Sequence, residues 1–223
     1  PEFIGHSEPF YRMLQQIERV ASAEAPLLIL GESGTGKELV ARAIHRLGPR
    51  RHGPFVGENC AAISPPILES ELFGHDRGAF TGAHSERAGL IESTHGGILF
   101  LDEITETSGD LQSKLLRVLQ EKEIRRVGGN RSRKIDFRLV TASHRNLAEE
   151  VEEKRFRDDL RYRIDVLRVQ LPPLRQRRQD IPVLCRALLN RYCRRLGKKM
   201  TIISADAMTV LISAKWQGNI REL

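Results

Sequence analysis

The sequence predicts an α/β fold in which helices cover both faces of a parallel sheet, followed by a small helical domain. Short apolar runs alternate with segments of helical periodicity. A glycine-rich loop ending in lysine joins the first run to a helix. Beyond Leu171-Pro172-Pro173-Leu174 only helical patterns remain. These observations predict an α/β core over residues 1–172 and a helical domain over 173–223, truncated at its C-terminal end.

Apolar runs mark the strands of the predicted sheet. The run Ile98-Leu99-Phe100-Leu101 is apolar throughout, as central parallel strands are because both of their faces are buried. The predicted strands span 25–30, 54–56, 98–101, 136–141 and 166–170.

Helical periodicity follows most of these runs. Val40, Ile44 and Leu47 share one face of a helix that begins at Lys37. Ser64 precedes two prolines and begins the next helix, since proline suits the first helical turn. Further helices are predicted over 110–123, 181–196 and 204–214, and Asn219 is expected to cap a last one.

The composition excludes several classes of protein. Of 223 residues, 40% are hydrophobic and 29% charged, which is typical of a globular chain. No apolar run reaches the roughly 20 residues of a membrane span, and no signal peptide opens the chain. The 3 cysteines form no CxxC and the 7 histidines no HExxH, which disfavours a disulfide framework or a structural zinc site. We expect a cytoplasmic protein.

The chain is basic, with a formal net charge of +7 and a pI near 9.7. Such a surface favours polyanions such as a nucleotide, a nucleic acid or an acidic partner, although a plain basic face is the simpler interpretation of charge alone. Aromatic residues amount to only 5%, which argues against a base-stacking binder of single strands.

The segment from Gly31 to Lys37 fits the pattern GxxxxGK between a strand and a helix. Glycines let such a loop turn its backbone N–H groups toward an anion, and the helix adds its positive end. Lys37 would reach the β- and γ-phosphates. The usual Ser or Thr ligand for magnesium is replaced by Glu38, so the metal must depend on other groups. The residues of this segment expected to bind nucleotide are Gly31, Glu32, Ser33, Gly34, Thr35, Gly36, Lys37, Glu38 and Leu39.

Two acids, Asp102 and Glu103, follow the central apolar run. Carboxylates at the C-terminal end of a central strand lie at the ligand edge of a parallel sheet. We expect Asp102 to hold Mg²⁺, directly or through water, and Glu103 to polarise the attacking water. An isolated Asp-Glu pair is an ordinary strand end, but together with GxxxxGK it indicates ATP hydrolysis.

The segment Gly78-Ala79-Phe80-Thr81-Gly82-Ala83 has no evident role in a nucleotide site and, on its residues alone, predicts a mobile loop tip with one contact aromatic. It resembles, letter for letter, the GAFTGA signature of bacterial enhancer-binding proteins, the AAA+ activators of sigma-54 RNA polymerase. Residues 31–38, including the acid after the lysine, are similar to that family's Walker A form. Residues 69–75 and 218–223 also resemble family motifs, so the resemblance covers essentially the whole chain.

The resemblance implies a five-stranded αβα ATPase core with a helical lid, assembled as a homo-oligomeric ring, usually a hexamer, with a heptamer as the alternative. ATP and Mg²⁺ would lie between subunits. Turnover would move the 78–83 loop, which contacts the sigma-54 factor, and convert closed to open promoter complexes. A regulatory domain, and a module that binds enhancer DNA, are expected outside these residues.

The family's functional residues match several positions here. Asn59 matches the asparagine that restrains the catalytic glutamate until the γ-phosphate is sensed. Arg157 and Arg163 match the arginine fingers, which reach a neighbouring subunit's nucleotide and neutralise charge on the phosphoryl group. Apart from the resemblance, a strand-end asparagine and a solvated basic helix face are the plainer interpretations.

Further positions match the sensors and the adenine site. Arg221 matches the sensor II arginine, and Ile4-Gly5 the stretch that lines adenine. At the first sensor Ser143 keeps the usual hydroxyl and is expected to contact the nucleotide. The basic glycine turn over 128–134 predicts a hairpin. The resemblance implies that this hairpin lies beside the 78–83 loop, and two interpretations stay open for it, contact with promoter DNA and a solvated hairpin.

Two other functions compete with a sigma-54 activator. Another AAA+ machine, such as an unfoldase or a helicase loader, would share the phosphate loop and the Asp-Glu pair but would not need the 78–83 loop. A non-enzymatic DNA-binding regulator fits the basic charge, yet no helix-turn-helix pattern occurs in these residues.

Overall fold

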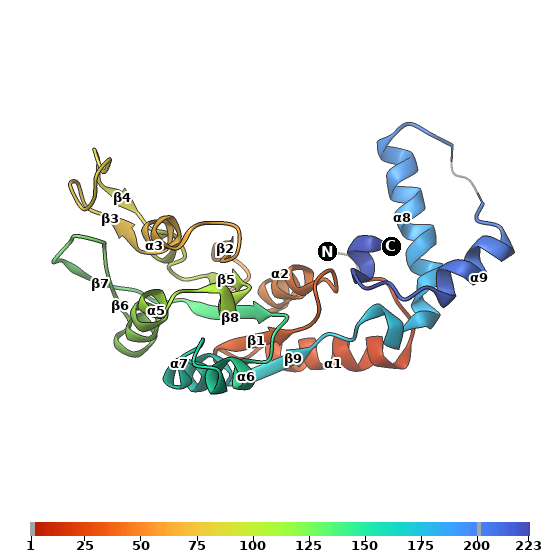
Figure 1. The fold of residues 1–223 in the computed structure, drawn as a ribbon, viewed down its shortest axis with the longest axis horizontal. Helices are drawn as coiled ribbons and strands as arrows, with labels where there is room; N and C mark the ends of the chain where they lie inside the picture. Colours follow the sequence, from red (N-terminus) through yellow and green to blue (C-terminus); the bar gives the residue numbers. More distant parts are fainter. Residues whose placement is uncertain (1–2, 200–201) are drawn as a thin grey trace.

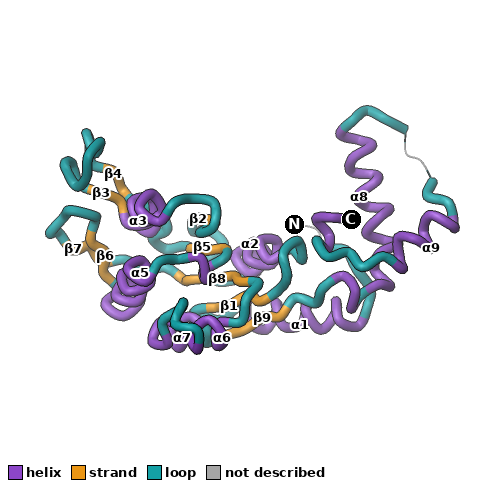
Figure 2. The backbone as a smooth tube through the Cα atoms, viewed as in Figure 1, coloured by secondary structure: helices purple, strands orange, loops and turns teal. Residues whose placement is uncertain are grey.

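A five-stranded parallel sheet lies at the centre of the protein in the computed structural model, which describes residues 3–199 and 202–223 (Figures 1 and 2). The strand order is β2-β5-β8-β1-β9. The strands are β1 (Leu27–Leu30), β2 (Phe55–Asn59), β5 (Ile98–Asp102), β8 (Arg138–Ser143) and β9 (Leu167–Gln170). Each predicted run forms one of them, which confirms the predicted sheet, although β8 begins at Arg138 rather than at Asp136.

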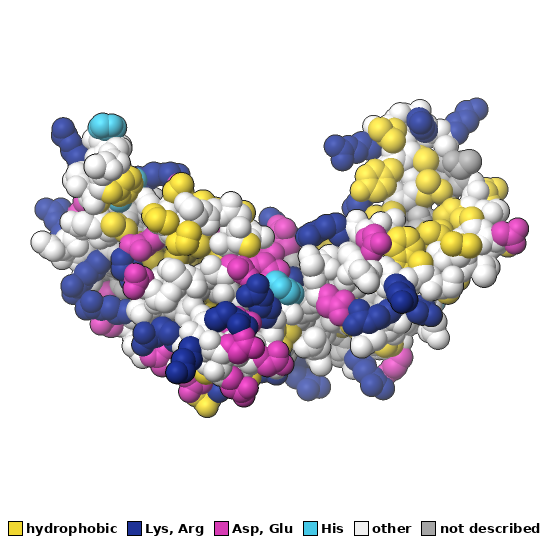
Figure 3. Space-filling model, viewed as in Figure 1, with side chains coloured by type: hydrophobic (Ala, Val, Ile, Leu, Met, Phe, Trp, Pro, Cys, Tyr) yellow, Lys and Arg dark blue, Asp and Glu magenta, His cyan; other side chains and the backbone are white. Residues whose placement is uncertain are grey.

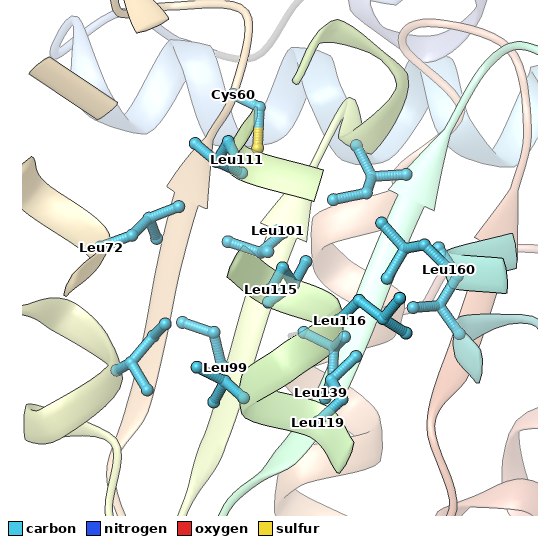
Figure 4. Packing of buried hydrophobic residues seen from close by; sticks show 14 of the residues in the cluster. Cys60, Leu72, Leu99, Leu101, Leu111, Leu115, Leu116, Leu119, Leu139 and Leu160 are labelled. Atoms are coloured by element: carbon cyan, nitrogen blue, oxygen red, sulfur yellow. The ribbon is translucent and has the colours of Figure 1, made fainter. Parts of the chain in front are cut away.

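Helices cover both faces of this sheet because side chains alternate along each strand. In β5, Ile98 and Phe100 belong to one apolar cluster, while Leu99 and Leu101 belong to the other. The first cluster packs under α1 (Glu8–Ala21) and α2 (Lys37–Leu47). Figure 4 shows leucines of α5 packed over β5 in the second cluster. The helices on that face are α3 (Pro65–Phe73), α4 (Leu90–Ser93), α5 (Gly109–Glu121), α6 (Leu147–Glu152) and α7 (Asp158–Ile164).

Helix α1 is not among the predicted helices, although its buried residues recur at helical spacing: Phe10, Met13, Ile17 and Val20. The buried guanidinium of Arg138 donates to the carbonyl oxygens of Val20, Ala21 and Ala25, which satisfies groups at the end of this helix.

The prediction for the end of α2 was wrong in one respect. Leu47 was expected on the buried face with Val40 and Ile44, but it is 59% exposed. The helix ends at this residue and Gly48 continues in an extended conformation, so the Leu47 side chain, unlike that of Ile44, lies outside the core. Helix α5 likewise ends at Glu121 rather than at Glu123, because Lys122 takes a left-handed conformation and β6 begins.

The C-terminal part forms a third apolar cluster around Leu174, Ile181, Leu184 and Cys185. Its helices are α8 (Ile181–Arg195), α9 (Ala205–Ser213) and α10 (Asn219–Glu222). Ser204 accepts a hydrogen bond from the backbone of Ala207 and caps α9. Asn219, in contrast, does not cap α10.

Two small hairpins lie at the end of the molecule remote from α8 (Figure 1). One pairs β3 (Gly74–His75) with β4 (Arg87–Ala88), and the residues between them include 78–83. The other, predicted from its glycine turn, pairs β6 (Glu123–Arg125) with β7 (Ser132–Lys134). Within residues 3–199 and 202–223, no helix combines the length and apolar character that crossing a membrane requires.

Candidate functional site

The phosphate loop leads from β1 into α2, which begins at Lys37. Gly34 and Gly36 take positive φ angles of 79° and 102°, a region that glycine enters without strain. The hydroxyl of Thr35 donates to the carbonyl oxygen of Glu32 at 2.7 Å and closes the turn. The loop therefore presents the start of α2 as an anion site, as the sequence predicts.

Lys37 is buried, and two hydrogen bonds fix the position of its ammonium group. The Nζ atom lies 3.1 Å from the carbonyl oxygen of Gly31 and 3.1 Å from Oε1 of Glu103. The lysine thus connects the phosphate loop to the acids at the end of β5. The carboxylate of Glu38 pairs with Arg42 one turn later.

Glu103 lies just beyond β5 in a left-handed conformation, with φ at 53°. Such a φ is uncommon for a residue other than glycine, and strained backbone of this kind concentrates at functional sites. Its second carboxylate oxygen, Oε2, lies 2.6 Å from Nδ1 of His144. His144 follows β8, which neighbours β5 in the sheet. The histidine follows Ser143 in the predicted first sensor, but the sequence predicted no contact between it and Glu103, which the strand order brings within reach.

The two adjacent acids have opposite pKa shifts. Burial raises the pKa of Asp102, although the charge of Lys37 offsets part of this effect. Burial alone would also raise the pKa of Glu103, but the bonds from His144 and Lys37 outweigh it, so this pKa is lowered. Glu103 is therefore held ionised. Asp102 forms no ion pair with a described Lys or Arg, so a divalent cation would compensate its charge.

A pocket of about 490 Å³ brings most of the predicted residues together. It is lined by Ser33, Gly34, Gly36, Lys37, Glu38, Leu39, Arg42, Asn59, Asp102, Glu103, Ile220 and Arg221. Figure 3 shows the surface hollowed between the β3–β4 hairpin and α8, with acidic and basic side chains at its floor. No group of three or more His, Cys, Asp or Glu in the described chain forms a metal centre by itself. A single carboxylate beside a phosphate loop nevertheless suits Mg²⁺, which is commonly held by one or two carboxylates and the substrate's phosphates.

Two residues predicted at the site, Asn59 and Ser143, bond backbone groups close to them in the chain. The side chain of Asn59 accepts from the backbone of Ala61 at 2.9 Å and does not bond Glu103. The hydroxyl of Ser143 bonds the backbone of Arg145 and does not line the pocket. The histidine after Ser143, rather than the serine, reaches Glu103.

The predicted arginine fingers also lie outside this pocket. Arg157, just before α7, pairs with Asp159 at 2.7 Å. Arg163, within α7, donates to the carbonyl oxygen of Leu119 at 3.0 Å. Both side chains are at the surface.

Helix α10 of the C-terminal part forms hydrogen bonds with the phosphate loop. Arg221 donates to the hydroxyl of Ser33 at 3.1 Å, and the backbone of Ile220 donates to Gly34 at 3.1 Å. The fully buried amide of Asn219 donates to Ser33 and accepts from the backbone of Leu174 at 2.8 Å. Asn219 therefore braces the loop instead of capping α10, which corrects the prediction.

A second, more apolar pocket of about 170 Å³ adjoins the first and shares Gly36, Leu39 and Ile220 with it. Ile4 lines it, as predicted for an adenine site. Gly5 does not; a side chain there would begin 2.7 Å from the ring of Phe10, so glycine permits close packing instead.

The 78–83 loop closes on itself at the other end of the molecule. Gly78 donates to the carbonyl oxygen of Ala83 at 2.9 Å, and both Gly78 and Gly82 have positive φ. Phe80 is 45% exposed, and its ring meets His75 edge-on. The predicted exposed aromatic is confirmed.

An ion-pair cluster ties this loop's base to the β6–β7 hairpin. Arg126 bonds both carboxylate oxygens of Glu92, at 2.7 and 3.1 Å, and lies 3.3 Å from Glu86 and 3.8 Å from Asp76. The backbone of Asp76 donates to Val127 at 3.1 Å. The hairpin therefore supports the loop, while the loop tip stays free.

Comparisons with known proteins agree with this geometry. Residues 3–170 match the family described as Sigma-54 interaction domain, and residues 175–223 the AAA+ ATPase lid domain. The chain is 52% identical over 220 residues to a Nif-specific regulatory protein of Herbaspirillum seropedicae, covering 99% of this chain and 41% of that regulator. It is 49% identical to the formate hydrogenlyase transcriptional activator FhlA of Escherichia coli over 222 residues, 100% of this chain and 32% of FhlA. The crystal structure of NtrX from Brucella abortus in complex with ATP has a TM-score of 0.93 at 41% identity, covering 99% of this chain and 48% of that one.

Proposed function

The chain belongs to the Sigma-54 interaction domain family, and from this premise we propose that it is the ATPase of a sigma-54-dependent activator, which remodels the closed promoter complex into the open one. The observation that carries the proposal is the combination of two features: a phosphate loop and an Asp-Glu pair in one pocket, and a 78–83 loop whose aromatic Phe80 is exposed. The chain spans less than half the length of the regulators it matches first, so the rest of such an activator lies outside it. An AAA+ machine with another target would not need this loop.

The pocket's residues suggest how hydrolysis is controlled. The backbone of the phosphate loop and Lys37 would hold the phosphates of ATP. Asp102 would hold Mg²⁺, which would neutralise charge on the β- and γ-phosphates. A phosphate bound in the loop would compete with Glu103 for the ammonium of Lys37, because the Glu103 carboxylate lies 3.1 Å from that ammonium. Glu103 would then be restrained by His144 alone and free to accept a proton from water.

Several residue roles rest on the family together with their placement. Asn59 lines the pocket and is proposed to restrain Glu103 until the γ-phosphate is sensed, whereas His144 makes that contact in this structure. Arg157 and Arg163 are exposed and outside their own pocket, which supports a role as fingers toward a neighbouring protomer of a homohexameric ring. Arg221 is proposed as the arginine that senses nucleotide from the lid.

We propose that residues 1–172 form the ATPase core and 173–223 the lid. The third apolar cluster begins at Leu174, and the two family matches divide between 170 and 175. Because α10 bonds the phosphate loop directly, nucleotide binding and lid position would be coupled.

The test is Glu103→Gln, which keeps the shape of the side chain and removes the base. We expect ATP binding to persist and phosphate release to fall by about 100-fold or more, the usual contribution of a general base. Glu106→Gln, an exposed acid three residues later that pairs with Arg145, is the matched control and should leave turnover unchanged.

The second readout is co-migration of the wild-type protein with sigma-54 in the presence of ADP and a metal fluoride. Near-normal turnover by Glu103→Gln would remove Glu103 from the proposed role. If the wild-type protein, assembled as a ring, neither releases phosphate nor binds sigma-54, the proposed function is wrong.

A further inference from the structure

The structure contains a buried cation whose role the phosphate site does not explain. Arg177 lies before α8 and is only 4% exposed. Among the described residues its Nε atom has no hydrogen-bond partner, and no carboxylate forms an ion pair with its guanidinium. Burial lowers the pKa of this arginine, although the charge of Asp180 offsets part of the effect. A buried charge without a partner is costly, so its retention calls for a ligand.

The nearest acid is engaged elsewhere. Asp180 accepts hydrogen bonds from the backbone of His6 at 2.7 Å and of Ser7 at 2.8 Å, and from the Ser7 hydroxyl at 2.7 Å. These bonds fix the N-terminal segment against the start of α8. Asp180 therefore moderates the charge of Arg177 at a distance without satisfying its donors.

Arg177 faces the apolar pocket that adjoins the phosphate loop. It lines this pocket together with Ile4, Phe10 and Leu184, but it does not line the pocket that contains Lys37 and the acids. Gly36 and Leu39 line both pockets. A nucleotide whose phosphates lie on the loop would therefore place its base beside Arg177.

We propose that Arg177 is a base-recognition residue, whose guanidinium donates a hydrogen bond to a ring nitrogen of the purine. The inference rests on the proposed binding of ATP to this chain. A guanidinium has only donors, and the unsubstituted ring nitrogens N1, N3 and N7 of adenine are acceptors, so the two groups are complementary. The apolar walls hold the flat base and exclude water, which strengthens such a bond.

The proposal predicts that loss of the Arg177 guanidinium lowers ATP affinity without lowering the thermal stability of the nucleotide-free protein. Arg177→Met removes a charge that has no partner, so the nucleotide-free protein should keep or gain thermal stability. The same variant should bind ATP about 10- to 100-fold more weakly, the usual effect of losing a hydrogen bond from a charged donor. If the arginine had only a structural role, its replacement would lower thermal stability and ATP affinity together.

The experiment measures ATP affinity by calorimetry and the unfolding temperature of the nucleotide-free protein. Arg178→Met is the matched control, because Arg178 is the exposed neighbour, and it should change neither quantity. In wild type, one of 1-deaza-, 3-deaza- and 7-deaza-ATP should bind more weakly than ATP. In Arg177→Met that same analogue should bind as well as ATP does.

Three results would overturn the proposal: an unchanged ATP affinity in Arg177→Met, a loss of affinity matched by a lower unfolding temperature, or equal binding of ATP and all three analogues by wild type. The third result needs wild type alone, so the analogues can overturn the proposal even if the variant does not fold. Failure of wild type to bind ATP at all would instead reject the proposed function.

Discussion

The phosphate loop and the 78–83 loop both depend on glycines with positive φ, but their surroundings differ. A Cβ atom at Gly34 would lie 2.1 Å from the carbonyl oxygen of Gly218, whereas one at Gly78 or Gly82 would meet nothing within 4 Å. The first loop also accepts hydrogen bonds from α10, while the second bonds mainly to itself. Glycine in the phosphate loop therefore serves both conformation and packing; in the 78–83 loop it serves conformation alone. One loop is held by the rest of the chain, and the other is left available to a partner.

The comparison is tested most strongly by placing alanine in each loop. Gly34→Ala forces the phosphate loop and α10 apart, so we expect a loss of about 3–5 kcal/mol in the free energy of unfolding and a severe loss of ATP affinity. Gly78→Ala has only the cost of positive φ, about 1–2 kcal/mol, and should leave ATP affinity unchanged. Denaturant unfolding and nucleotide titration measure both, and equal losses in the two variants would contradict the packing difference.

A smaller effect is expected at the support of the 78–83 loop. Glu92→Gln weakens the paired bonds to Arg126 and should lower the free energy of unfolding at neutral pH by about 2 kcal/mol. The bonds from Arg126 lower the pKa of Glu92 below its ordinary value of 4.5. The unfolded chain then binds more protons in acid, so this stabilisation is present above pH 4.5 and is lost as pH falls through the folded-state pKa.

Wild type and Glu92→Gln should therefore converge in stability as the pH is lowered. The control is Glu121→Gln, which breaks an exposed pair with Arg117 one turn away and should cost about 0.5 kcal/mol or less at every pH. A constant difference between wild type and Glu92→Gln down to low pH would show that the carboxylate's charge is not what stabilises the loop base.

The smallest effect on turnover is expected at the loop tip. Thr81→Ala should leave phosphate release within about twofold of wild type, because the side chain is exposed and remote from the pocket residues. It should nevertheless abolish co-migration with sigma-54 in the presence of ADP and a metal fluoride. Ser85→Ala removes another exposed hydroxyl between β3 and β4 and should retain both activities. Full sigma-54 binding by Thr81→Ala, or binding lost only in proportion to turnover, would show that the phosphate loop and the 78–83 loop do not have separate roles.

Local patterns in the sequence were sufficient for most of the fold. Continuous apolar runs identified the strands, and the glycine-lysine loop identified where the first strand meets a helix. Even α1, which was not predicted, has a readable stripe at helical spacing. The errors lie at element ends, such as Leu47 and Asp136, where packing beyond the element decides which residues are covered.

By itself, the sequence determined the strands, the phosphate loop, the Asp-Glu pair and the exposed loop, because each depends on neighbouring residues and simple periodicity. Only the tertiary structure decided what holds these groups. His144 reaches Glu103, 41 residues away in the chain, because β8 lies beside β5. Asn219 bonds Ser33 across 186 residues because the C-terminal part folds back over the phosphate loop. Such contacts follow from strand order and from the position of the lid, and no local pattern in the sequence specifies either.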